Sequence, residues 1–182
     1  MQSIRRIDMK KSLQDLQKIR GIGEVLAKRL VEAGHDTYEK LQALGEDGLR
    51  AVKGINPRAI GSILSQAAEL VESKGKERAR RVEELRSAAL TLRGQVEEIA
   101  RSVRDRFADE VQGQGGKKLE KQFTKIMTSF DRVEGKLEKR TKRAAKGLAK
   151  AEKRLAGLVD GTMKDVEKGV RRARKSLKRI LA

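Results

Sequence analysis

The fold of this chain is decided by a stretch near its N-terminus, Leu16-Gln-Lys-Ile-Arg-Gly-Ile-Gly-Glu-Val-Leu-Ala-Lys-Arg-Leu30. Two glycines, separated by one apolar residue, stand between segments whose apolar residues recur at helical spacing. Because glycine has no Cβ, the chain can reverse tightly at this point. The stretch therefore predicts two short helices joined by a hairpin, the second starting at Glu24 and ending at Gly34.

A second, weaker copy of this pattern lies 33 residues further along the chain. The matched positions are Leu16 with Leu49, Ile19 with Val52, Gly21 with Gly54, Ile22 with Ile55, Leu30 with Ile63 and Val31 with Leu64. Asn56 takes the place of Gly23, a substitution that we explain by the tolerance of asparagine for a positive φ. Residues 12–72 are therefore predicted to be an internal repeat of helix, hairpin and helix.

The first copy resembles the helix-hairpin-helix family, whose core is an apolar residue, Gly-apolar-Gly, an alanine and a further apolar residue. These are Ile19, Gly21-Ile22-Gly23, Ala27 and Leu30. The pair of copies is similar to the two-motif domains of DNA-repair proteins and to the C-terminal domain of the RNA polymerase alpha subunit. The resemblance implies a small helical domain over residues 12–74 whose helix N-termini bind backbone phosphates without reading bases. The implied contacts are Arg20, Gly21, Ile22, Gly23, Lys28, Lys53, Gly54, Ile55, Asn56 and Arg58.

The first hairpin departs from the family at the position after its second glycine. Members often have a Pro-Lys-like pair there, whereas this chain has Glu24 and Val25. A carboxylate at the start of a helix competes with phosphate for the same amide groups. The second hairpin, with Arg58 beside it, is therefore expected to be the better phosphate site. A purely protein-docking role for residues 12–74, called the head below, stays open.

Beyond residue 75 the apolar residues recur at spacings of three and four, which predicts long helices with an a/d seam. The glycine-rich residues 112–116 predict a turn in this seam. Val103 with Ile126, and Val96 with Val133, have residue numbers that sum to 229, so the seams before and after the turn are predicted to pair as an antiparallel hairpin. This register places Arg93 near Lys136. After the turn the seam is expected to run on to Ile180.

The predicted fold class is therefore all-α, a small helix-hairpin-helix domain plus a long antiparallel helical hairpin or coiled coil. Residues 1–11 are expected to form a basic arm, residues 12–74 the tandem domain, and residues 75–182 the coiled coil with a basic C-terminal helix. Whether the seam closes within one chain or between copies, as a homo-oligomer, stays open at this stage.

Charge is the second strong signal in the sequence. The chain carries 44 basic and 26 acidic residues, and residues 117–182 hold 22 of the basic but only 8 of the acidic ones. An imbalance of this size predicts a polyanionic partner. We expect this partner to be nucleic acid, with duplex DNA the first candidate, and the choice between DNA and RNA stays open at this stage. The expected contacts of the tail are Lys139, Arg140, Lys142, Arg143, Lys146, Arg171, Arg172 and Lys175.

Other classes of function find little support in the residue types. The chain has no cysteine, and it has no nucleophile constellation, carboxylate cluster or phosphate-binding loop of the enzyme kind. Its four aromatic residues do not make a base-stacking platform, and the three phenylalanines occupy seam positions and are expected in the core. No apolar run is long enough to cross a bilayer, and residues 163–182 lack the aromatic side chains typical of membrane-surface helices. We therefore expect no enzyme activity, cofactor, metal or membrane contact, and a cytoplasmic location at the nucleoid.

Two functions remain after these exclusions. The first is a non-catalytic, sequence-nonspecific DNA-binding protein, nucleoid-associated or accessory to repair. The second is a coiled-coil scaffold or oligomerisation protein that uses its head to dock other proteins. A phosphate binder must lose affinity steeply as salt rises, whereas assembly through an apolar seam should respond little.

Overall fold

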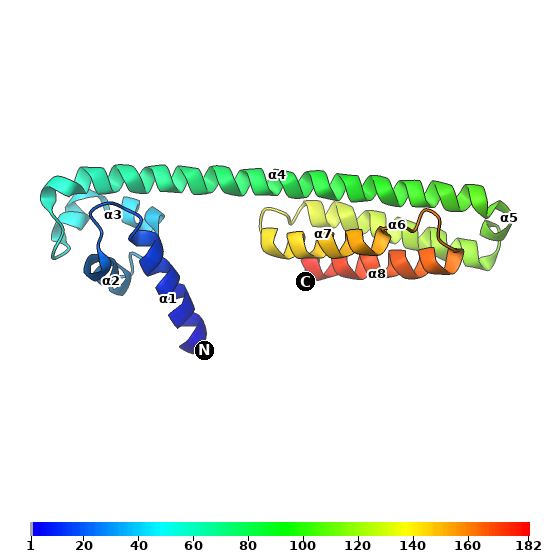
Figure 1. The fold of residues 1–182 in the computed structure, drawn as a ribbon, viewed down its shortest axis with the longest axis horizontal. Coiled ribbons are helices and arrows are strands. Elements are labelled where there is room, and N and C mark those ends of the chain that lie inside the picture. The colour runs from blue at the N-terminus through cyan, green and yellow to red at the C-terminus, as the bar shows by residue number, and fades with distance from the viewer. Residues whose placement is uncertain (1) are drawn as a thin grey trace. The chain divides into compact units, whose positions relative to one another are not determined.

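In the computed structural model, residues 2–182 are described, together with the side chains of residues 9–109 and 111–182. This part of the chain is all-α and contains no strand, which confirms the predicted fold class (Figure 1). Its contacts divide it into two compact units, Met1–Arg78 and Ala79–Ala182. The helix α4 (Ile60–Arg106) contributes residues to both units. None of the described helices has the length and apolar character that crossing a membrane requires.

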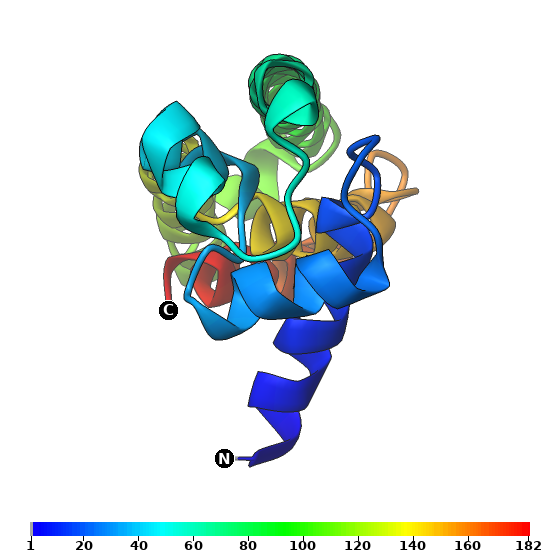
Figure 2. The same ribbon diagram turned by 90° about the vertical axis from the view of Figure 1, so that its left-hand side faces the viewer.

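The first unit contains α1 (Gln2–Leu16), α2 (Glu24–Glu32), α3 (Tyr38–Ala51), the short 3-10 helix η1 (Pro57–Ala59) and the first part of α4 (Figure 2). A positive φ of 69° at Gly45 kinks α3. Apolar residues from both copies of the repeat pack together in one core. Its buried members are Leu16, Ile19, Ile22, Leu26, Ala27, Leu30, Tyr38, Leu41, Leu49, Ile60, Ile63 and Ala67.

The N-terminal segment differs from its prediction. A loose arm was expected before Ser12, but the helix α1 already begins at Gln2, and it ends at Leu16 rather than at Gly21. Residues 2–16 contain neither glycine nor proline, so nothing in this segment opposes a helix.

The second unit contains the later part of α4, α5 (Ala108–Val111), α6 (Gln114–Glu134), α7 (Thr141–Leu155) and α8 (Met163–Leu181). The helices α7 and α8 pack most extensively on each other, and α6 packs on α8 (Figure 1). The predicted seam residues are the core of this unit. They include Val82, Leu85, Leu92, Val96, Ile99, Val103, Leu119, Phe123, Ile126, Phe130, Val133, Leu137, Ala144, Leu148, Leu155, Val166, Val170, Leu177 and Ile180, all buried.

The number of chain reversals was underestimated from the sequence. One reversal was predicted, whereas the second unit has three, at residues 107–113, 135–140 and 156–162. The heptad spacing continues across the second reversal, from Leu137 to Ala144, and changes to intervals of 4, 4 and 3 across the third. The helices α4, α6, α7 and α8 all bury their apolar faces in the same core. The tail of this chain is therefore a helical bundle rather than one long two-stranded hairpin.

The predicted register of the first reversal is also wrong. Three ion pairs join α4 to the following segment, Arg86 to Glu138, Arg93 to Asp131 and Arg104 to Glu120, and the residue numbers of each pair sum to 224 rather than 229. The non-helical residues of the turn are 112 and 113, because Gly115 and Gly116 already belong to α6. Arg93 thus meets Asp131, at 2.7 Å, and not Lys136.

Candidate nucleic-acid interface

The first hairpin leaves the start of α2 open. Gly21 has a φ of 98°, which allows the chain to reverse, and the amide of Ile22 donates to the carbonyl of Ile19 at 3.1 Å. Gly23 precedes α2 in extended conformation, with a φ of −80° and no side-chain cap on the helix. The exposed amides at this end of α2 therefore point out with the positive end of the helix dipole behind them.

The second hairpin repeats this backbone. Gly54 has a φ of 99°, and the amide of Ile55 donates to the carbonyl of Val52 at 3.3 Å. Asn56, however, has a φ of −74°, so our explanation by a positive φ is wrong. Its side-chain oxygen instead accepts the amide of Arg58 at 3.0 Å. Asparagine stands here because it caps η1, and this cap occupies one of the amides that a phosphate would use.

A side chain from the opposite half of the head holds each hairpin. The amide of Arg20 donates to the side-chain oxygen of Gln66, on α4, at 2.9 Å. Nη1 of Arg29, on α2, donates to the carbonyl oxygen of Lys53 at 2.6 Å. Arg29 therefore adds an exposed positive charge to the second hairpin, whose own cations Lys53 and Arg58 are exposed as well. Arg29 is not among the predicted contacts, since it lies outside both hairpins.

The other residues of the head that were predicted to contact phosphate differ in the exposure of their side chains. The side chains of Arg20 and Lys28 are exposed, as contacts to a phosphate require. Ile22 is buried and Ile55 half-buried against the core, so these two can offer only their backbone to a ligand. Glu24 is the first residue of α2, as predicted, and its exposed carboxylate competes for the open amides.

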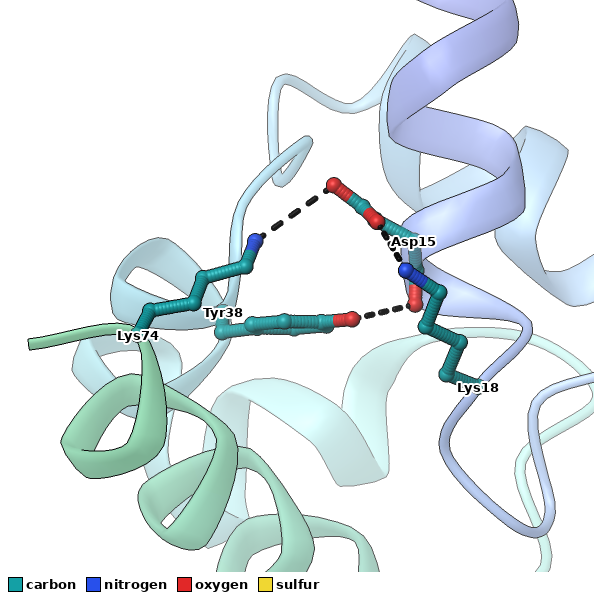
Figure 3. Close-up of polar contacts among 4 residues, drawn as sticks. All are labelled: Asp15, Lys18, Tyr38 and Lys74. Atoms are coloured by element: carbon teal, nitrogen blue, oxygen red, sulfur yellow. Dashed lines mark hydrogen bonds and ion pairs between the residues drawn. The ribbon is translucent and has the colours of Figure 1, made fainter. Parts of the chain in front are cut away.

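A group of hydrogen bonds and ion pairs connects α1 to α3 and α4 within the head (Figure 3). The hydroxyl of Tyr38 donates to the carbonyl of Asp15 at 2.7 Å, and the Asp15 carboxylate pairs with Lys18 at 2.7 Å and with Lys74 at 3.4 Å. The ammonium of Lys74 also lies 4.2 Å from the centre of the Tyr38 ring. Partial burial would raise the pKa of Asp15, but the hydrogen bond from Lys18 and the charge of Lys74 outweigh it, so the pKa is lowered.

In the tail, α7 and α8 approach closely because small residues line their contact. A Cβ on Gly147 would overlap the Ile180 side chain and lie 3.3 Å from the carbonyl of Ser176. A Cβ on Gly169 would overlap Leu158 in the same way. The guanidinium of Arg154 donates to the carbonyl of Arg172 at 2.8 Å. These contacts fix the antiparallel register of the two helices.

The predicted cations of the tail are exposed with one exception. Arg140 is half-buried, and its Nη1 donates to the carbonyl of Ile180 at 2.9 Å near the end of α8. This guanidinium therefore stabilises the bundle and is a poor candidate for binding phosphate. The cations exposed to solvent are Lys139, Lys142, Arg143, Lys146, Arg171, Arg172 and Lys175.

Ion pairs divide the surface of the second unit into two parts. Cations of α4 that face the start and end of α6 are neutralised, at Arg86, Arg93 and Arg104. Among the described side chains of residues 139–182, by contrast, no cation forms an ion pair with a carboxylate. The second unit has further exposed cations besides the predicted contacts, and those of α7 and α8 lie within the predicted basic runs. They are Lys118, Lys121 and Lys125 on α6, Lys150 and Lys153 on α7, and Lys168, Lys178 and Arg179 on α8.

Comparison with known proteins identifies the head. Residues 13–69 match the family model described as the SAM-like helix-hairpin-helix tandem. This segment, about a third of the chain, is therefore a helix-hairpin-helix tandem, as the resemblance predicted. No curated protein and no solved structure matches the chain.

Proposed function

We propose that this protein is a non-catalytic, sequence-nonspecific binder of duplex DNA that contacts the phosphate backbone, in a nucleoid-associated or repair-accessory role. The observation that carries this proposal is the exposed surface of α7 and α8, whose described cations have no carboxylate partner. Surface cations with acidic neighbours gain little from a polyanion, since they must first give up those neighbours. Unpaired cations gain the full release of counterions from the nucleic acid.

The head supports the same function by a different physical route. Its open amides at the start of α2, and the exposed cations Arg29, Lys53 and Arg58, suit a phosphate that approaches the helix ends. Such contacts depend on backbone geometry and supply less charge than the tail. We therefore assign most of the affinity to α7 and α8, and a smaller, geometry-dependent part to the hairpins.

Duplex rather than single-stranded nucleic acid is favoured by the positions of the aromatic side chains. Tyr38, Phe123 and Phe130 are buried, and Phe107 is half-buried against the core. They offer no platform on which unpaired bases could stack. Recognition must then depend on charge, and a duplex presents roughly one charge per 1.7 Å of its axis.

A mobility-shift titration tests this function directly. We expect binding to duplex DNA of unrelated sequences with equal affinity, and a loss of affinity of at least tenfold between 50 and 200 mM salt, given several phosphate contacts. Affinity that does not change with salt, or that depends on one sequence, would overturn the proposal.

A second function for the head is favoured by one observation. The side chain of Val25 is 65% exposed beside the carboxylate of Glu24, at the tip of the first hairpin. An apolar side chain next to an acid suits a protein partner better than a phosphate. A Val25→Asp substitution that abolishes capture of a partner, but leaves the salt dependence of DNA binding intact, would support docking by this hairpin.

A further inference from the structure

We infer that α7 and α8 straddle a groove of the duplex, with the cations of α7 along one strand and those of α8 along the other. This inference rests on the proposed function and specifies how the α7–α8 surface engages its ligand. It implies that this surface distinguishes two strands held at duplex spacing from one strand alone.

Gly147 on α7 and Ser176 on α8 lie at one of the close contacts between the two helices. On α7, Arg143 and Lys150 stand about one turn before and after Gly147. On α8, Arg172 and Arg179 stand about one turn before and after Ser176. Four exposed cations therefore surround one contact, two from each helix.

The four cations form two rows because each pair belongs to one helix. Arg143 and Lys150 are seven positions apart, and so are Arg172 and Arg179, so each row extends over about 10 Å. Each row therefore offers two cations that can each contact a phosphate of the same strand. Helices in contact lie about 8–10 Å apart, between the widths of about 6 and 12 Å of the two grooves of B-form DNA.

Electrostatics supports two strands rather than one. The four cations lie close together, and no described carboxylate forms an ion pair with any of them. Like charges held at this spacing repel each other. A ligand that follows only one row leaves the other row uncompensated, whereas the two strands of a duplex neutralise both.

Paired substitutions in the full-length protein test the inference. The variants are Arg143→Gln with Lys150→Gln on α7, and Arg172→Gln with Arg179→Gln on α8. The matched control, Arg93→Gln with Arg104→Gln, removes the same charge where it is already paired with Asp131 and Glu120. Binding to a duplex and to a single strand of the same length is measured over a series of salt concentrations, and circular dichroism checks that each variant is folded.

The expected result differs between the two ligands. Each row variant should lower the salt slope on the duplex by about 1.8, because two contacts are lost at about 0.9 each. On the single strand the intact row still binds, so the slope should fall by less than about 0.7. The control should change neither slope appreciably.

Each other outcome has a defined meaning. If both row variants lower the single-strand slope by about 1.4, one strand uses both rows and the straddling arrangement is wrong. It is equally wrong if one row variant leaves the duplex slope unchanged. A parent protein that binds neither ligand would instead refute the proposed function itself, and a control variant that lowers the slope as much as the row variants would refute the assignment of binding to α7 and α8.

Discussion

The left-handed turn at Gly54 gives the most direct test of the hairpin architecture. Its φ of 99° is strained for any residue with a Cβ, at a cost of roughly 1–2 kcal/mol. A Cβ there would also lie 2.7 Å from Nη1 of Arg29, displacing a hydrogen bond to Lys53 that contributes about 0.5–1.5 kcal/mol. Alanine restricts the unfolded chain and so returns about 0.4–1 kcal/mol. We expect Gly54→Ala to destabilise the head by about 2 kcal/mol.

The head can be observed alone within the full-length protein. Tyr38 is the only tyrosine, the chain has no tryptophan, and the Tyr38 ring is buried in the head. With a urea dependence of about 1 kcal/mol per molar for so small a unit, its fluorescence midpoint should fall by about 2 M. Gly23→Ala is the matched control, because Gly23 has a negative φ and a Cβ there meets nothing within 4 Å. Equal shifts for the two variants would refute the requirement for a left-handed turn.

Three further predictions concern packing, salt and pH. Gly147→Ala should lower the melting temperature of the tail, measured by circular dichroism. The control Gly94→Ala lies on an exposed part of α4 with open space around it, and it should raise the free energy of unfolding by about 0.5–1 kcal/mol. Equal effects of the two variants would contradict close packing at Gly147. Raising sodium chloride from 0.05 to 0.5 M should raise the melting temperature of the tail, because salt screens the unpaired cations of α7 and α8; a fall would indicate that ion pairs dominate. The lowered pKa of Asp15 means that its ion pairs stabilise the head above about pH 4, and this contribution is lost as pH falls through the folded pKa. Asp15→Asn should therefore weaken the dependence of Tyr38 fluorescence on acid pH. An unchanged profile would exclude Asp15 as the source of this dependence.

The core residues could be predicted from the sequence, but the path of the chain between them could not. Burial follows spacing, so positions such as Val96, Ile126 and Leu177 are identified by their three- and four-residue intervals alone. The reversal at residues 135–140 keeps the seven-residue repeat from Leu137 to Ala144, so the apolar pattern contains no sign of it. The reversal at residues 156–162 coincides with spacings of 4, 4 and 3 between Leu155 and Val166, a break that a stutter in a continuous helix produces as well. The register depends on where the helices stop, and Gly115 and Gly116 belong to a helix although their composition is typical of a turn.

For the site, the sequence identified the helices that carry the cations but misassigned the roles of some residues. Charge runs identified α7 and α8, whose outward cations include Arg143, Lys146 and Lys175. They also included Arg140, because composition cannot distinguish a guanidinium that faces solvent from one that donates to the carbonyl of Ile180. The role of Asn56 was misassigned because a sequence position does not reveal whether an asparagine enters a left-handed turn or caps a helix.

The place of α8 in the core has a consequence for synthesis of the protein. The last helix supplies buried residues up to Ile180, so the bundle cannot close until nearly the whole described chain has been made. The head, whose residues come first, can fold much earlier, as N-terminal domains generally do during translation. Until α8 emerges, the apolar stripes of α6 and α7 lack their main neighbour, and the growing chain is then most exposed to aggregation. Ribosome stalling or premature termination within the codons for α8 should therefore leave a folded head attached to an unfolded, aggregation-prone tail.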